Sequence, residues 1–185
     1  MAKLTFSKGN RKLNDLAIAL QLKKTQVVGF DLPAGYTCPK ADKCLSFSNR
    51  VTGKITDGKS TQFRCYAASI ESAFTSVRKA HWQNYESIKN LNSDDIASLI
   101  LSELPKNVKV VRVHASGDFF SKEYFIAWTK VAEKRPDVSF FGYTKVLQYV
   151  SAEKPGNFKL VYSFGGKMDS KLKNEPVAYV VPDAD

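Results

Sequence analysis

Apolar residues along the chain form short runs typical of buried strands and longer repeats typical of amphipathic helices. Valine-rich and aromatic runs predict strands at 25–32, 107–116, 138–144, 158–164 and 177–181. Repeats at three- and four-residue steps predict helices at 12–24, 67–90, 93–104 and 121–135. Thr-Gly and Asp-Gly pairs between residues 47 and 63 indicate turns and a hairpin. This order of elements predicts an α/β fold with a mostly parallel sheet and flanking helices.

The length of 185 residues suits a single domain, 1–185, and no internal repeat or linker divides it. Within it we expect a basic N-terminal helix in 1–24, a cysteine loop in 33–66 and an α/β core in 67–181. No apolar run approaches the roughly 20 residues that span a bilayer. The first residues also lack the apolar core of a signal peptide. We therefore expect no membrane partner and a reducing cytoplasm, where structural disulfides are rare.

The formal net charge is +10, which is high for this length. Basic residues crowd the first 24 positions, where Asp15 is the only acidic residue. Such a surface attracts polyanions, so nucleic acid is a candidate partner. The alternative is a solvated basic surface without a specific partner.

Cys38, Cys44 and Cys65 are the only cysteines, in the spacing C-x5-C-x20-C. Three thiols cannot all pair as disulfides with one another. A zinc site normally needs a fourth ligand, which here would be His81 or His114, and closer cysteine pairs. A [4Fe-4S] cluster on three cysteines leaves one iron open for a non-cysteine group or a small-molecule ligand. A cluster is the favoured prediction; zinc and unligated thiols stay open as alternatives.

Polar and glycine-rich segments follow the predicted strands, where the working residues of parallel sheets collect. His114 and Asp118 are candidate acid–base residues after the strand at 107–116. Hydrogen bonds within the fold are the alternative role for both. The histidine at position 81 is expected to pack in the core. Lys145, Gly165 and Gly166 follow later strands, where they are placed to cradle an anionic ligand.

Several segments resemble the phage gene product 88 family. The resemblance runs from about Ser7 to Gly166 and implies a phage or mobile-element origin, hence the host cell cytoplasm. The segments that carry it are "SKGN", "LPAGYTCP", "CLS", "TGKITDG", "FRCYAAS", "HASGDFFSKEYF" and "RPDVSFFGYTK".

A wider similarity is to radical SAM enzymes, which carry a cluster loop after the first strand of a partial (β/α) barrel. That resemblance implies a reduced radical SAM core and S-adenosylmethionine as a second cofactor. Ser116, Gly117 and Asp118 would occupy the glycine-rich segment that meets its amino group. The hallmark C-x3-C-x2-C is replaced here by much wider spacings.

Motifs of kinases, serine hydrolases, zinc proteases and dinucleotide-binding enzymes are missing from the sequence. We therefore expect a phage-type iron–sulfur protein with redox or radical SAM-like chemistry. The alternative is a basic nucleic-acid-binding module in which zinc or a cluster fastens the cysteine loop.

Overall fold

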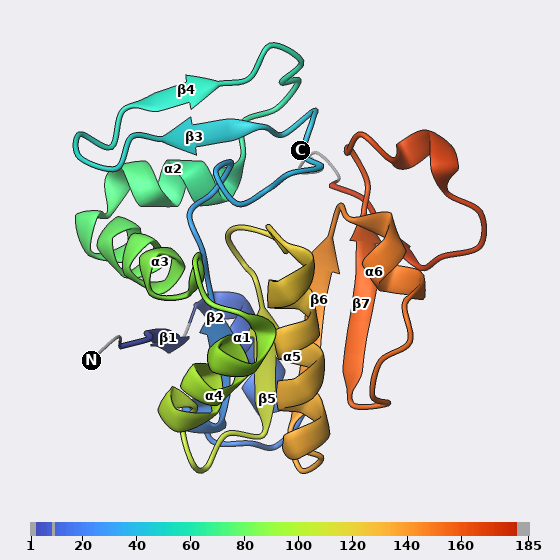
Figure 1. Ribbon diagram of the computed structural model, residues 1–185. Helices are drawn as coiled ribbons and strands as arrows, with labels where there is room; N and C mark the ends of the chain where they lie inside the picture. The colour runs from blue at the N-terminus through green and yellow to red at the C-terminus, as the bar shows by residue number, and fades with distance from the viewer. Residues whose placement is uncertain (1–2, 9, 181–185) are drawn as a thin grey trace.

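A six-stranded sheet runs through the part of the chain that the computed structural model describes, residues 3–8 and 10–180 (Figure 1). Its order is β1-β2-β5-β6-β7-β8, with β1 antiparallel to β2 and every other pair parallel. The bounds are β1 (Phe6–Lys8), β2 (Val27–Phe30), β5 (Val110–Val113), β6 (Ser139–Thr144), β7 (Phe158–Ser163) and β8 (Val177–Ala178). The predicted mostly parallel sheet is confirmed.

Helices flank this sheet, and a short hairpin lies above the carboxyl ends of its strands (Figure 1). The hairpin pairs β3 (Ser46–Ser48) with β4 (Ile55–Asp57), as the turn signals predicted. The helices are α1 (Arg11–Ala19), α2 (Tyr66–Ala73), α3 (Thr75–Ile88), α4 (Ser93–Glu103), α5 (Lys122–Lys134) and α6 (Leu147–Ser151).

The main core lies between one face of the sheet and α4, α5 and α6. Trp128 of α5 and Phe30, Phe140 and Phe158 of the strands are almost completely buried there. The parallel strands follow one another across the sheet without reversal, and right-handed crossovers place their connecting helices on one face. The other face is covered by α1, whose Leu13 packs beside Val27 and Val110.

The sheet has β1 and β8 at its two edges. The structure therefore shows a mixed α/β fold with an open sheet, and the finer expectation of a radical SAM-type partial barrel is not shown by it. Among the described residues, no helix is both long and apolar enough to cross a bilayer.

Two of the predicted helices have different limits. The N-terminal helix was predicted to reach residue 24, but α1 ends at Ala19, and residues 6–8 form a strand. Gln21 adopts a left-handed conformation with φ of 54°, and Leu22 N–H donates to the carbonyl of Ala17. This is a Schellman-type ending without its usual glycine, so no residue signalled it. The helix predicted at 67–90 is broken at Phe74, whose φ and ψ of −119° and 100° are extended.

The predicted strands are longer than the observed ones. The strand at 107–116 shortens to β5, because His114 takes a positive φ of 71° and leaves the ladder. The strand predicted at 177–181 shortens to β8, and residue 181 lies outside the described residues. The short helix α6 was not predicted.

Candidate functional site

The three cysteines line one cavity of about 440 Å³ at the carboxyl ends of the parallel strands. This volume falls within the range of about 300–1,000 Å³ that is usual for small-molecule and cofactor sites. Five other residues predicted for the site share its wall: His114, Ser116, Gly117, Asp118 and Lys145. The cavity thus joins three loops, after β2, β5 and β6, with the segment that ends at Cys65. We call it the cysteine cavity.

Cys38 lies at the end of a tight turn that follows β2. The carbonyl of Pro33 accepts two hydrogen bonds from Thr37, one from the hydroxyl (2.8 Å) and one from the backbone N–H (3.2 Å). Cys38 N–H donates to the carbonyl of Gly35 at 3.2 Å. Gly35 has a φ of 77°, and a Cβ there would collide with the Ser46 carbonyl oxygen. The turn therefore holds the Cys38 sulfur against the carboxyl end of the sheet.

The segment before Cys44 is fixed to the end of β7 by backbone pairing. Lys43 N–H donates to the carbonyl of Gly165 at 3.1 Å, and Ala41 forms a bridge with Gly166. The N–H groups of both glycines donate to the carboxylate of Asp169, at 3.0 and 2.9 Å. Neither glycine lines the cysteine cavity. The Gly165 carbonyl and the bridge at Gly166 hold the cysteine loop in place, whereas the sequence suggested that the two glycines cradle an anionic ligand.

Cys65 is the N-cap residue of α2 and makes no side-chain cap hydrogen bond. Its own N–H donates to the hydroxyl of Ser46 at 3.2 Å. The next two residues, Tyr66 and Ala67, line the cavity, so the amino end of α2 faces it. Free N–H groups at a helix start carry partial positive charge, which stabilises a thiolate or an anionic cofactor.

Burial raises the pKa of the Cys38 thiol well above its ordinary value, and the nearby Asp118 carboxylate raises it further. Burial also raises the pKa of Cys44, and the ammonium group of Lys145 acts in the opposite direction. That ammonium is held by the carbonyls of Ser163 (3.0 Å) and Phe164 (2.7 Å). The cavity therefore has a fixed cation beside its sulfurs, and a bound metal must displace their protons.

Asp118 lies in the cavity wall, but its carboxylate is already engaged. One oxygen accepts from Phe119 N–H (2.7 Å) and the Thr144 hydroxyl (2.6 Å), and the other accepts from Lys145 N–H (2.9 Å). Burial raises the pKa of Asp118. These bonds tie the loop after β5 to the loop after β6, which is the structural role weighed for Asp118 from the sequence.

His114 is 3 % exposed and faces the cysteine cavity. Its Nε2 is hydrogen-bonded to the Tyr124 hydroxyl at 2.9 Å, whereas its buried Nδ1 has no partner among the described residues. Burial, together with the Arg112 charge, lowers the pKa of His114 to about 3. The ring is therefore neutral at ordinary pH. It does not continue the alternation of β5 beside Arg112 and Val110, as the sequence suggested, because its backbone leaves the strand.

Gly117 allows the loop after β5 to approach the loop after β2. Its φ is 84°, and a Cβ there would lie 2.6 Å from Thr37 Oγ1 and 2.7 Å from Leu32 Cβ. We expect Gly117→Ala to lower the free energy of unfolding by about 3 kcal/mol, from backbone strain and steric overlap together. Gly156→Ala is the control, since no atom lies within 4 Å of the added Cβ. Urea unfolding of both variants measures the difference, and equal losses would contradict this account.

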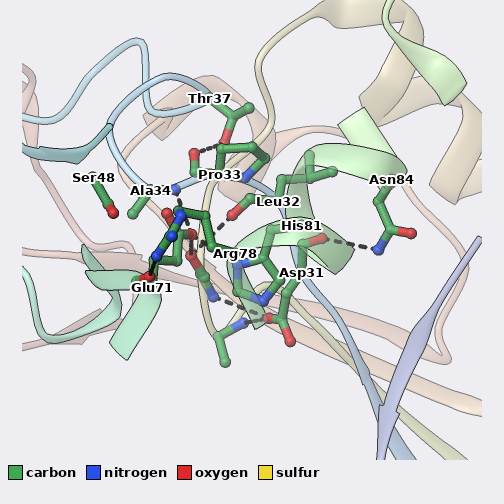
Figure 2. Close-up of polar contacts among 12 residues, drawn as sticks. Asp31, Leu32, Pro33, Ala34, Thr37, Ser48, Glu71, Arg78, His81 and Asn84 are labelled. Atoms are coloured by element: carbon green, nitrogen blue, oxygen red, sulfur yellow. Dashed lines mark hydrogen bonds and ion pairs between the residues drawn. The ribbon is translucent and has the colours of Figure 1, made fainter. Parts of the chain in front are cut away.

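A network of buried polar side chains on α2 and α3 contacts the cysteine loop (Figure 2). Glu71 is completely buried, and its Oε1 accepts from Ala34 N–H and the Ser116 hydroxyl, both at 2.9 Å. His81 Nδ1 lies 2.7 Å from the same oxygen. Sequence reasoning placed His81 in an apolar core and missed Glu71. The available signal was a polar residue at each of positions 71, 78, 81 and 84 on one face of the helical repeat.

Two further members of that face hold neighbouring segments. Arg78 is almost buried and donates to the carbonyls of Arg50, Val51 and Glu71, so it fastens the hairpin to α3. Asn84 donates to the carbonyl of Asp31 at 3.0 Å, just after β2 and before the cysteine loop (Figure 2). The loop is thus positioned by buried side chains distant in sequence.

Within residues 3–8 and 10–180, no group of three or more His, Cys, Asp or Glu side chains is placed to hold a single metal ion. His81 is turned to Glu71 rather than to the cysteines. The described geometry therefore contains no preformed Cys3His zinc site.

Comparisons with known proteins place the chain in a family. The model of the Gene product 88 family matches residues 4–185. The Gene 88 protein of Mycobacterium phage L5 is 28% identical over 148 residues, and that of Mycobacterium phage D29 is 30% identical over 149. Each alignment covers 74% of this chain and 55% of the relative, so the chain spans about half the length of these curated proteins. No solved structure matches. These relatives support a bacteriophage origin, and the chain belongs to the Gene product 88 family.

Proposed function

We propose that Cys38, Cys44 and Cys65 hold a [4Fe-4S] cluster, and that the protein uses it for redox or radical-type chemistry on a small molecule. The fourth iron is open to the cavity or bound by a non-cysteine group. The observation that supports this proposal is the meeting of all three sulfurs in one cavity of about 440 Å³.

The chemistry of the donor set fits a cluster better than a single ion. Ligands of one zinc ion must each come within about 2.3 Å of the same point. Thiolates on different irons of a cluster stand farther apart, so they need not converge in that way. Cys38, Cys44 and Cys65 share a cavity, and the described residues contain no group of three or more His, Cys, Asp or Glu side chains placed on one ion.

The surroundings also suit an anionic centre. The amino end of α2 and the ammonium group of Lys145 both lie at the cavity and offset negative charge. When bound, the cluster supplies one-electron transfer and an iron with an exchangeable position. The neutral His114 ring offers Nδ1 to a molecule in the same cavity, as a donor or an acceptor according to its tautomer.

S-adenosylmethionine is a candidate ligand for the open iron, on the strength of the resemblance to radical SAM enzymes. Ser116 and Gly117 line the cavity where that resemblance puts its amino group. The Asp118 carboxylate already accepts three hydrogen bonds, so it offers an ammonium group less than the sequence suggested.

Iron and sulfide analysis of protein purified without oxygen tests the proposal. We expect about four iron atoms and a similar amount of acid-labile sulfide per chain. Reduction by dithionite should give an EPR signal that broadens or shifts when S-adenosylmethionine is added. A protein that holds zinc, or no metal after reconstitution with iron and sulfide, would contradict the cluster. An EPR signal unaffected by S-adenosylmethionine would exclude this molecule as the ligand of the open iron and leave the cluster proposal standing.

Nucleic-acid binding is the second candidate, and the net charge of +10 favours it. In this account the metal only fastens the cysteine loop. It predicts affinity for DNA or RNA that falls steeply with salt and does not depend on the redox state of the protein. Gel-shift titrations at two salt concentrations, with oxidised and reduced protein, measure both properties.

A further inference from the structure

A second cavity, of about 470 Å³, adjoins the cysteine cavity. The two share part of their walls, including Lys12, Tyr66, Arg112 and Ala115. The Tyr66 hydroxyl donates to the Ala115 carbonyl at 2.6 Å, so this side chain stands between the two spaces. We call the second space the basic cavity.

Positive charge dominates the walls of the basic cavity. Lys8, Arg11, Lys12 and Arg112 all line it. Among the described residues, Asp31 is its only carboxylate, and this group is already occupied. Hydrogen bonds from two backbone N–H groups (2.6 and 3.0 Å) and from a serine hydroxyl (3.0 Å) satisfy the Asp31 oxygens. The cations therefore face a space to which the described part of the chain supplies no free carboxylate.

The strongest sign of a missing partner is at Arg112. Its Nε is buried and has no hydrogen-bond partner in the described part of the chain. Its guanidinium lies over the Tyr143 ring, 5.6 Å from the centroid. Across the described residues, no carboxylate lies within 4.0 Å of the charged groups of Arg112, Lys8 or Lys12. Cationic side chains without a carboxylate partner form charge-assisted hydrogen bonds with a bound anion.

The opposite wall of the basic cavity is apolar. Ile70 and Val77 line it beside the ring of Tyr66. Ile70 lies on α2, the helix that Cys65 caps, and its side chain is 43% exposed. A ligand that satisfies both walls carries an anionic head and an apolar body.

We propose that the basic cavity binds a small organic phosphate. Its phosphate lies between Arg112 and Lys12, and its apolar body lies against Ile70 and Val77. Arg112 and Lys12 also line the cysteine cavity, so the bound molecule can extend past Tyr66 toward the three sulfurs. The inference that the organic phosphate reaches the sulfurs and is the substrate rests on the proposed function. Phosphate binding itself does not.

Phenyl phosphate is a minimal probe, because it has both the head and the apolar body. Its binding to the cluster-free full chain is followed by broadening of its ³¹P resonance, with inorganic phosphate and phenol as control ligands. We expect saturable binding of phenyl phosphate that is at least about tenfold tighter than that of either control, from the added contribution of each half. Because the protein is free of cluster, failure of the cluster proposal does not affect this result.

Three variants locate the binding site. Arg112→Gln and Lys12→Gln should each weaken phenyl phosphate binding by about tenfold, as expected for the loss of a charge-assisted hydrogen bond. Lys106→Gln removes the same charge from an exposed position at the other end of β5 and should leave the affinity unchanged. Lys12 is itself exposed, so its variant tests the cavity even if Arg112→Gln fails to fold.

Three outcomes would overturn the proposal. The first is an absence of saturable binding. The second is equal weakening in all three variants, which would indicate non-specific attraction by the net charge. The third is oligonucleotide binding that depends on Lys12 and Arg112 while phenyl phosphate fails to bind. That result would assign the same cations to nucleic acid.

Discussion

Cys65→Ala is expected to abolish the proposed iron–sulfur centre. The variant purified without oxygen should lose the brown visible absorption, most of its iron and the EPR signal of the reduced protein. The physical reason is that Cys65 joins the two other sulfurs in the cysteine cavity and comes from the opposite side, at the start of α2. With Cys65 removed, the cavity retains two of its three thiolate ligands, which are too few to hold the cluster. Iron content and EPR together measure the loss.

Ser69→Ala is the matched control for this variant. Ser69 lies on the same helix, and its hydroxyl donates to the carbonyl of Cys65 at a long 3.4 Å. Its removal should leave iron content unchanged. Cys38→Ala and Cys44→Ala should reproduce the loss seen with Cys65→Ala. A full EPR signal in any of the three cysteine variants would remove that cysteine from the ligand set.

Glu71→Ala is expected to cause a large loss of stability. Its carboxylate is fully buried and accepts from Ala34 N–H and the Ser116 hydroxyl, and it lies beside His81 Nδ1. Alanine leaves Ala34 N–H and the His81 ring buried without this partner, whereas the Ser116 hydroxyl keeps the Leu32 carbonyl. The loss costs about 3 kcal/mol in the free energy of unfolding. Urea unfolding of the cluster-free protein measures this quantity. Because Ala34 belongs to the turn that carries Cys38, cluster assembly should fall as well.

Glu133→Ala controls for the removal of a carboxylate. Glu133 is exposed on α5, and its loss should change the free energy of unfolding by less than about 0.5 kcal/mol. Glu71→Gln keeps one carbonyl oxygen as an acceptor. Its loss in the free energy of unfolding should lie between the losses of Glu71→Ala and Glu133→Ala. If Glu71→Ala were no more destabilising than Glu133→Ala, the buried network would have no supporting role.

Local patterns in the sequence predicted most of the secondary structure. Valine-rich runs predicted the parallel strands, and the apolar repeat at 121–135 predicted α5, where the Ser121 hydroxyl oxygen accepts from Tyr124 N–H. The Thr-Gly and Asp-Gly pairs predicted the hairpin. Where a local signal was absent, the prediction failed. Gln21 ends α1 in a conformation usual for glycine, and Phe74 breaks the helix predicted at 67–90.

The sequence predicted most of the residues that line the cysteine cavity, but not the buried residues that hold its loops in place. Residues at strand ends meet at one edge of a parallel sheet, so Cys38, His114 and Lys145 were expected near each other. The contacts of Glu71 with Ala34 and Ser116 span 37 and 45 residues, and no local pattern reveals such pairs. The roles of Gly165 and Gly166 likewise depend on Asp169 and on the cysteine loop, which only the folded chain brings to them.

Anomalous X-ray diffraction at the iron absorption edge tests the central proposal most directly. Crystals of the full chain, grown without oxygen, should show a compact group of iron peaks in the cysteine cavity, within bonding distance of the Cys38, Cys44 and Cys65 sulfurs. A map without iron there, or with one peak that follows the zinc edge instead, would contradict it.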